Sequence, residues 1–482
     1  MLLSRRDSAV LTLPRLARMR YVSLLCAALI AFLPFLTFDL YAQSAPHPNQ
    51  IIPDGRTQTG LQTSGNVTNV TTSTVSGPNA FNSFSQFGVG QGNTVNLQLP
   101  SGSQNLINIV RDAPAYVNGT LNSYANGKIG GNVYFADPQG FVVGATGTVN
   151  VGSLNVSTPT REFTDKLIGA QGQINGAAVS SLMNGSFPIS PDGNIRILGR
   201  VNAADGVRLT GQNVSVGPST SQRERVNQDH AAQFAASVNS KGLHSASGIV
   251  VRNGSIHIVA AGNAKVSGRL VAHSRSTTPS TISVAAGKNI QIAKTANLST
   301  ASKKGDAGNI SLKADGDLTV ASGAAINASS TIGNAGLVEL SAKGTATIGQ
   351  INLNLAAPNG AAGTLLIDPY NLVIGDPNNP GAGSVLSTNS DYSYSGNLIT
   401  NGANVVLSAD NSITIANGGI IDTRQYNHAS ALSASNASTG NSGSITLNAP
   451  NITVNGQLLA DVVNANGTNV TPINDASQRE IK

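Results

Sequence analysis

Charged residues are scarce in this sequence: they make up 11% of its 482 residues, against a hydrophobic share of 40%. The hydrophobic share is too high for a disordered chain, and the low charge is unlike an ordinary helical protein. Tryptophan is absent, and phenylalanine and tyrosine number only 11 and 9. We therefore expect a core of Val, Ile, Leu and Ala, whose small and uniform side chains suit a repeating interior built from strands.

The first residues have the pattern of a secretory signal. Five arginines between residues 5 and 20 precede an uncharged stretch, Val22–Phe38, and small residues follow near Ala42. We predict a signal peptide over residues 1–42, with cleavage after Ala42. The alternative is an uncleaved anchor, but the apolar run of roughly 15 residues contains Pro34 and falls short of the ~20 residues that a spanning helix needs.

Outside the predicted signal peptide the sequence has no cysteine. The one cysteine, Cys26, lies in the predicted signal, so we expect a mature chain without disulfides that depends on buried area and backbone hydrogen bonds. Removing residues 1–42 lowers the formal net charge from +6 to +3, because five Arg and two Asp leave with them. The remaining Lys and Arg are scattered, so we expect no nucleic-acid partner.

Beyond about residue 250 the sequence repeats. Short alternating strands recur in groups of three between Gly, Asn, Asp and Ser turns, and Ile256, Ile282, Ile310 and Val338 follow one another at 26, 28 and 28 positions. Three short strands per repeat are typical of one turn of a parallel β-helix. The sequence therefore predicts an all-β fold: a right-handed parallel β-helix, a three-sided solenoid with an N-terminal cap and excursions from the helix.

Several segments depart from this rhythm. Residues 161–192 break it, as an excursion would, and residues 221–238 have the composition of a short helix. Residues 363–374 interrupt the pattern, which then resumes to about residue 460. The polar residues 461–482 are predicted to form a tail.

No pattern of catalytic or metal-binding residues emerges. The six histidines lack metal-motif spacing, Asp315 and Asp317 fit turns, and the Gly88–Gly92 run lacks the Lys-Ser/Thr of a phosphate loop. We therefore expect no enzyme, no cofactor and no metal site.

Three segments of the early chain carry a resemblance to a known family. They are Phe81–Val89, which contains Phe84 and Phe87, then Asn105–Arg111, and the run from Gly131 to Leu154 with Asp137-Pro138-Gln139-Gly140 at its centre. Together they resemble the two-partner secretion (TPS) domain of filamentous haemagglutinin-type exoproteins. In that family the central motif reads Asn-Pro-Asn-Gly; here Asp137 and Gln139 replace the two Asn, and we expect the turn to survive. Residues 363–374 are similar to a segment of leukotoxin-like filamentous adhesins.

The resemblance implies the following organisation and function. Residues 43–300 would be the TPS domain and residues 301–460 further coils with longer loops. The export motif would comprise Phe84, Phe87, Asn105, Arg111, Asp137, Pro138, Gln139 and Gly140. The chain would cross the inner membrane through the Sec machinery. It would then pass an outer-membrane barrel transporter whose periplasmic domains recognise the TPS domain.

The implied product is a filamentous adhesin of a Gram-negative bacterium, secreted, extracellular or on the outer cell surface, with an unknown host or surface ligand. The alternative is a carrier stalk of a toxin, a contact-dependent inhibition protein or a leukotoxin-type exoprotein. In that case the C-terminal effector would be missing, because the coil pattern runs to about Leu459.

Overall fold

The structure is a computed structural model. It describes residues 49–217, 247–273, 278–349, 351–374, 386–387, 397–400, 402–415, 419–423 and 443–460. The predicted signal with Ala42, the predicted helix at 221–238 and the predicted tail at 461–482 lie outside these residues. In the described part of the chain, no helix has the length and apolar character needed to cross a membrane.

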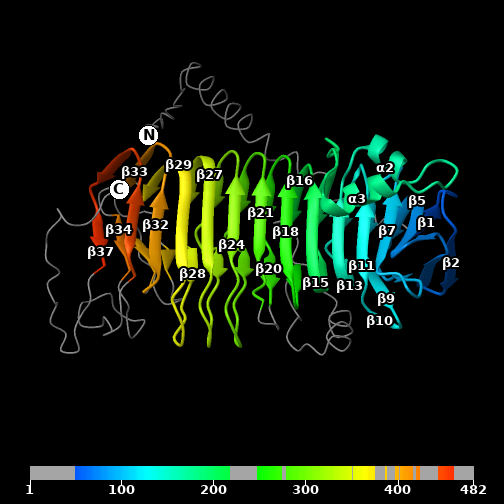
Figure 1. Cartoon of the computed structure of the whole chain (residues 1–482), viewed down its shortest axis with the longest axis horizontal. Coiled ribbons are helices and arrows are strands. Elements are labelled where there is room, and N and C mark those ends of the chain that lie inside the picture. The colour runs from blue at the N-terminus through cyan, green and yellow to red at the C-terminus, as the bar shows by residue number, and fades with distance from the viewer. Residues whose placement is uncertain are drawn as a thin grey trace, which may run out of the picture. The chain divides into compact units, whose positions relative to one another are not determined.

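Parallel strands in three columns make up most of the described chain (Figure 1). One column contains β18 (Ser255–Ala260), β21 (Ile282–Ala286) and β24 (Ile310–Ala314); the second contains β19 (Ala264–Val266), β22 (Ile290–Ile292) and β25 (Leu318–Val320); the third contains β20 (Arg269–Ala272), β23 (Asn297–Ser299) and β26 (Ala325–Asn327). Each strand pairs with the third strand after it, so one coil has three sides. The predicted three-sided parallel β-helix is confirmed.

The predicted repeat positions stack directly on one another. Ile256 is opposite Ile282, Ile282 is opposite Ile310, and Ile310 is opposite Val338. All four side chains are buried, because alternate residues of each strand point inward and the neighbouring coils cover them.

The earlier coils follow the same plan. Their strands are β5 (Asn79–Val89), β6 (Thr94–Gln98), β7 (Asn105–Val110), β8 (Ala115–Val117), β9 (Thr120–Ala125), β11 (Asn132–Ala136), β12 (Gly140–Val143), β13 (Thr148–Ser157), β14 (Asn194–Ile197), β15 (Arg200–Gly211), β16 (Asn213–Val216) and β17 (Gly248–Val251). The pairs β7–β11, β11–β13 and β13–β15 are parallel and continue the same column to β18. The stack is also continuous across residue 300, where β23 pairs with β26. The predicted domain boundary there remains a prediction.

Antiparallel strands cap the N-terminal end. The cap consists of β1 (Gln50–Pro53), β2 (Thr59–Ser64), β3 (Val67–Thr72) and β4 (Val75–Ser76). β1 and β4 pair with β5, β2 pairs with β3, and β3 continues in parallel to β6. A short strand, β10 (Lys128–Ile129), forms a hairpin with β9. Antiparallel pairing suits a cap, because it ends the coil stack without exposing a parallel edge.

The predicted excursion at residues 161–192 contains two short helices, α2 (Arg161–Leu167) and α3 (Gly176–Asn184). Thr160 and Asn175 cap their N-termini by accepting hydrogen bonds from Phe163 N and Ala178 N. Gly185 ends α3 in the left-handed conformation at φ 80°. Ser190 N donates to Thr158 O at 2.8 Å, so the segment leaves and rejoins the coils at nearly the same place.

The predicted interruption at residues 363–374 is wrong. This segment is β29 (Thr364–Ile374), a strand that pairs in parallel with β27 (Leu337–Ile348) and places Leu365 opposite Val338. Pro369 lies beside a register shift where the strand turns a corner, so it does not break the ladder. The remaining strands are β28 (Ile351–Asn354), β30 (Leu386–Ser387), β31 (Asn397–Ile399), β32 (Asn404–Ser408), β33 (Ser412–Ile415), β34 (Ile420–Asp422), β35 (Ile445–Asn448), β36 (Asn451–Val454) and β37 (Gln457–Leu459).

Side-chain hydrogen bonds link successive coils in one direction. Asn213 Oδ1 accepts from Asn263 N at 2.9 Å, Asn263 Oδ1 from Asn289 N, Asn289 Oδ1 from Asp317 N, and Asp317 Oδ1 from Thr345 N. In each of these bonds the acceptor belongs to the earlier coil. The same turns therefore hold their register by a repeated polar contact.

Candidate functional site

Phe84 and Phe87 lie inside the first coils. Their rings meet edge to face with centroids 5.1 Å apart, and Phe135 and Phe141 extend the row at 5.3 and 5.0 Å. All four side chains are buried. They fill the interior of the coils near the cap, whereas the interior of the later coils is filled by aliphatic residues. This position indicates a packing role.

Asn105 belongs to a ladder of amides on successive coils. Its Nδ2 donates to Asn79 Oδ1 at 2.8 Å, and its Oδ1 accepts from Asn132 Nδ2 at 2.9 Å. Ser153 Oγ then donates to Asn132 Oδ1. Asn105 therefore holds neighbouring coils in register, and its polar atoms are already satisfied within the chain.

The Asp137–Gly140 motif forms the corner between β11 and β12. Asp137 Oδ2 accepts from Ala115 N at 2.7 Å, and Asp137 Oδ1 accepts from Gln139 N at 2.9 Å. Gly140 has a φ of +119°, and a Cβ there would lie 2.3 Å from Asn194 O on the next coil. The predicted turn is thus present, and only glycine fits its last position.

Asp137 has no solvent exposure. Burial raises the pKa of Asp137 to about 8, and the N–H donors of Gln139, Ala115 and Gly140 oppose that rise. The side chain is hence a buried group that titrates near neutral pH, at a corner between two coils.

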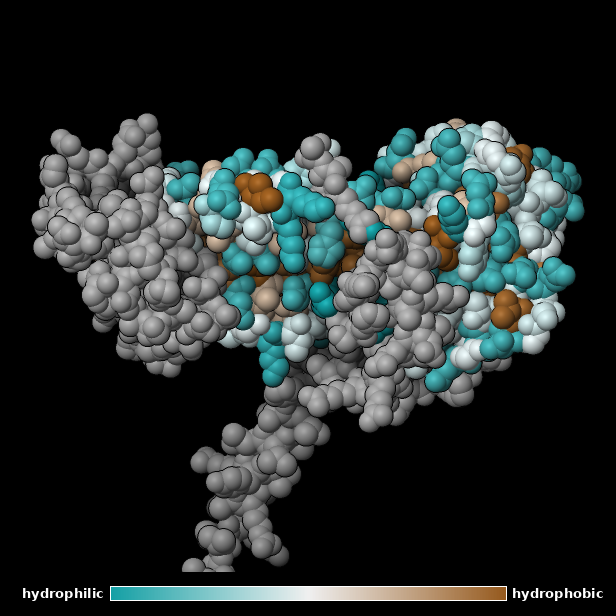
Figure 2. Space-filling model, turned by 90° about the horizontal axis from the view of Figure 1, so that it is seen from below, coloured by the Kyte–Doolittle hydropathy of each residue, from teal (hydrophilic) through white to brown (hydrophobic). Residues whose placement is uncertain are grey.

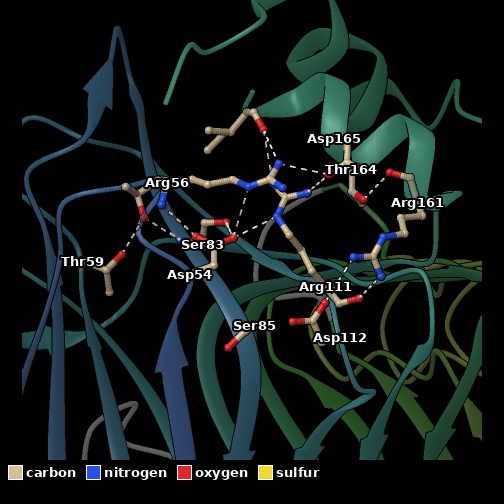
Figure 3. Close-up of polar contacts among 12 residues, drawn as sticks. Asp54, Arg56, Thr59, Ser83, Ser85, Arg111, Asp112, Arg161, Thr164 and Asp165 are labelled. Carbon is tan, nitrogen blue, oxygen red and sulfur yellow. Dashed lines mark hydrogen bonds and ion pairs between the residues drawn. The ribbon is translucent and has the colours of Figure 1, made fainter. Parts of the chain in front are cut away.

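Arg111 lies at the same corner one coil earlier, between β7 and β8, where it joins three parts of the chain (Figure 3). Its Nε donates to Asp54 Oδ2 in the cap at 2.9 Å, and its Nη1 donates to Asp165 Oδ1 in α2 at 2.7 Å. Arg56 Nη1 also reaches Asp165 Oδ1, at 3.0 Å. We call Asp54, Arg56, Arg111 and Asp165 the Arg111 cluster.

The cluster is buried at its centre and open at one side. The Arg111 side chain is 3% exposed and that of Asp54 is 10% exposed, whereas that of Asp165 is 43% exposed. Burial, followed by the charge of Arg56, lowers the pKa of Arg111 from its ordinary value, while Asp54 and Asp165 oppose this. The two carboxylates therefore compensate two guanidinium groups within hydrogen-bonding distance, which is the condition for burying charge at low cost.

The two helices cover an apolar strip on the outside of the first coils. We call Phe81, Ile107, Ile109 and Ala136 the outer strip; all four are fully buried. They form a cluster with Leu167, Ile168, Ala178, Val179 and Leu182 that is separate from the main core. Outward positions of these strands are therefore apolar only where the helical excursion packs on them.

The predicted motif residues do not form one site. Arg111 and the Asp137 corner do meet, because Gln139 Nε2 donates to Arg111 O at 3.3 Å. Phe84 and Phe87 lie in the interior, and Asn105 lies in its own ladder. Asp54, Arg56 and Asp165 were not predicted as site residues. In a chain with so few charges, the only signal in the sequence was the pair Asp54 and Arg56 next to a predicted cap.

Within the described ranges, no group of three or more His, Cys, Asp or Glu side chains could hold a metal ion. The polar side chains of the Arg111 cluster form hydrogen bonds with one another, and the carboxyl oxygens of Asp137 accept hydrogen bonds from backbone N–H groups of the chain. What the geometry defines is an N-terminal module of cap, first coils and helical excursion, tied together by one buried arginine. This is the N-terminal module of a parallel β-helix protein.

Comparison with known proteins identifies the module. Residues 49–269 match the family model of the TPS secretion domain, and the chain carries a domain of that family. Such domains direct export by two-partner secretion: an outer-membrane transporter recognises the domain, and the protein is secreted across the outer membrane.

One solved structure with a significant match is the secretion domain of HMW1 from Haemophilus influenzae, at 15% identity and a TM-score of 0.44, covering 86% of this chain and all of that one. Among curated protein sequences, none matches significantly.

Proposed function

We propose that this chain is a secreted or surface-exposed filamentous adhesin whose N-terminal module is read by an outer-membrane barrel transporter with periplasmic recognition domains. The match of residues 49–269 to the TPS secretion domain carries the export part of the proposal. The signal peptide predicted from the sequence would bring the chain to the periplasm through the Sec machinery.

The coils after residue 269 support the adhesin part. They continue the same stack to β37, with small polar residues such as Ser283, Ser311 and Thr319 in outward positions. Figure 2 shows a face that is mostly hydrophilic or neutral, with separate hydrophobic patches. Exposed large hydrophobic side chains in the described residues are few and dispersed, among them Ile332 and Tyr370. A long polar scaffold of this kind presents loops to a ligand and needs no reaction centre.

The export proposal is tested by secretion in a Gram-negative host that co-expresses the candidate transporter. We expect the full chain in the culture medium only when the transporter is present, and we expect a chain lacking residues 49–269 to remain in the periplasm. A matched deletion of residues 301–460, which leaves the matched family region intact, should still reach the medium. Release of the 49–269 deletion at the level of the full chain would contradict the proposal.

The adhesin proposal needs a separate test. The purified secreted chain should bind to host cells or to immobilised matrix components in a saturable way, and an excess of the same unlabelled chain should compete. If it shows no saturable binding, while bacteria with and without it adhere equally, the adhesin role is wrong and the export role still stands.

A further inference from the structure

The outer strip differs from the rest of its own column. Along the outward position of this sheet, Ile107 is followed on later coils by Tyr134, Asn155, Arg208, His257 and Ser283. This column is thus aliphatic only on an early coil, beneath the helical excursion, and becomes polar beyond it. The neighbouring outward column, which begins at Ile109 and Ala136, becomes polar at Ser157 and Thr210 and is apolar again at Val259, outside the excursion. An aliphatic surface in that position would be exposed to water if the excursion were not in place.

The excursion is attached to the cap as well as to the coils. Asp165 on α2 contacts Arg56 of the cap and Arg111 of the coil at the same Oδ1 atom. The carbonyl of Ile168, at the end of α2, accepts from both guanidinium groups, at 3.2 Å from Arg56 Nη1 and 3.3 Å from Arg111 Nη2. Asp54 completes the connection, because it accepts from Arg111 Nε and from Ser83 Oγ.

The partners of Arg111 lie far from it in the sequence. Asp54 precedes Arg111 by 57 residues and Asp165 follows it by 54. Loss of either contact leaves a buried guanidinium with reduced compensation, which is costly. Opening the excursion would therefore weaken the attachment of the cap, and opening the cap would weaken the attachment of the excursion.

We propose that the first part of the cap (residues 50–57, which contain Asp54 and Arg56), the helical excursion (residues 158–190) and the first coils are one cooperative unit that opens and closes about Arg111. Closing this unit removes the outer strip from water. The coils from β21 onward, which have no contact with the cluster, keep their structure when the unit opens. The device is conformational: the early coils expose an apolar surface until the later excursion docks on them.

Native-state hydrogen exchange of the full secreted chain tests this. In the wild type, amides of the cap and of the excursion should show the same free energy of opening. The dependence of this free energy on sub-denaturing urea should also be the same for both segments. Amides of residues 282–348 should exchange more slowly. The variant Asp165→Ala should speed exchange in both the cap and the excursion, by a factor on the order of 5 to 10, because it removes two charge-assisted hydrogen bonds at a partly exposed site.

Lys166→Ala is the matched control. Lys166 pairs with Glu162 on the exposed face of the same helix, so its loss should leave exchange in the cap unchanged. The proposal is overturned if Asp165→Ala speeds exchange in residues 158–190 alone. It is equally overturned if residues 282–348 open together with the cap. Should Asp165→Ala not fold, the urea dependence of the wild-type cap and excursion decides: different slopes for the two segments reject a single unit.

Discussion

Replacing Asp137 by Asn should change how stability depends on pH. The pKa of Asp137 is about 8 in the folded chain, against 3.8 ordinarily, so between these values the folded state binds more protons than the unfolded state. The contribution is fully present below pH 3.8 and is lost as the pH rises toward 8. Each pH unit in this range costs the wild type up to about 1.4 kcal/mol, or about 2 to 3 kcal/mol between pH 5 and 7.

The variant Asp137→Asn cannot titrate, so this term disappears. At pH 5 the variant should be less stable by about 1 to 3 kcal/mol, because the NH2 of Asn replaces one carboxyl oxygen and leaves a backbone N–H without an acceptor. As the pH rises to 7, the difference between variant and wild type should shift by about 2 to 3 kcal/mol in favour of Asn. All other titrating groups are common to the two proteins and cancel in the difference.

The chain has no tryptophan, which permits a local assay. Phe163 of α2 packs against the apolar cluster that contains the outer strip, so Phe163→Trp supplies a single tryptophan, located in the N-terminal module. Urea unfolding of this background, with and without Asp137→Asn, is followed by fluorescence at pH 5, 6 and 7. A stability difference that stays constant within about 0.5 kcal/mol across this range would refute the reasoning, because Asp137 would then titrate alike in the folded and unfolded chains.

Three further outcomes follow from the geometry. Gly140→Ala should destabilise the module by about 2 to 4 kcal/mol in the same urea assay, since φ is +119° and Cβ meets a backbone oxygen; an unchanged midpoint would contradict this. Leu312→Ala should cost about 3 kcal/mol in hydrogen-exchange protection of its own coil, while the outward Thr319→Ala should cost less than about 0.5; equal effects would refute the inside-outside assignment. Asn289→Ala should weaken hydrogen-exchange protection of the Asp317 amide by about 1 kcal/mol, and an unchanged protection of that amide would contradict the role of the contact.

The arrangement of the coils could be predicted from the sequence, because it follows from a short repeated pattern of apolar and polar residues. A period of 26 to 28 residues with alternating burial fixes which residues stack, and the observed register follows it from Ile256 to Val338. Residues 363–374 were misjudged because their strand runs through the dipeptide Asp368-Pro369, which the spacing of the repeat does not place. In the structure this dipeptide lies at a corner, and the strand pairs on both sides of it.

The Arg111 cluster could not be predicted in the same way. Its contacts join residues more than 50 positions apart, and no periodic pattern relates a cap, a strand end and a helix. The outer strip was concealed for a similar reason. Ile107 and Ile109 alternate with inward residues, so they read as outward positions, and only the docked helices explain why they are apolar.

The one-way bonds between turns have a consequence for the order of assembly. Every acceptor from Asn213 to Asp317 precedes its donor in the chain, so each completed turn already carries what the following turn requires. If the chain emerges with its N-terminus first, these turns can be laid down one after another, as in templated growth. The contacts of Arg111 differ, because its partner Asp165 follows it by 54 residues. The N-terminal end of the β-helix is therefore completed only after later coils have formed.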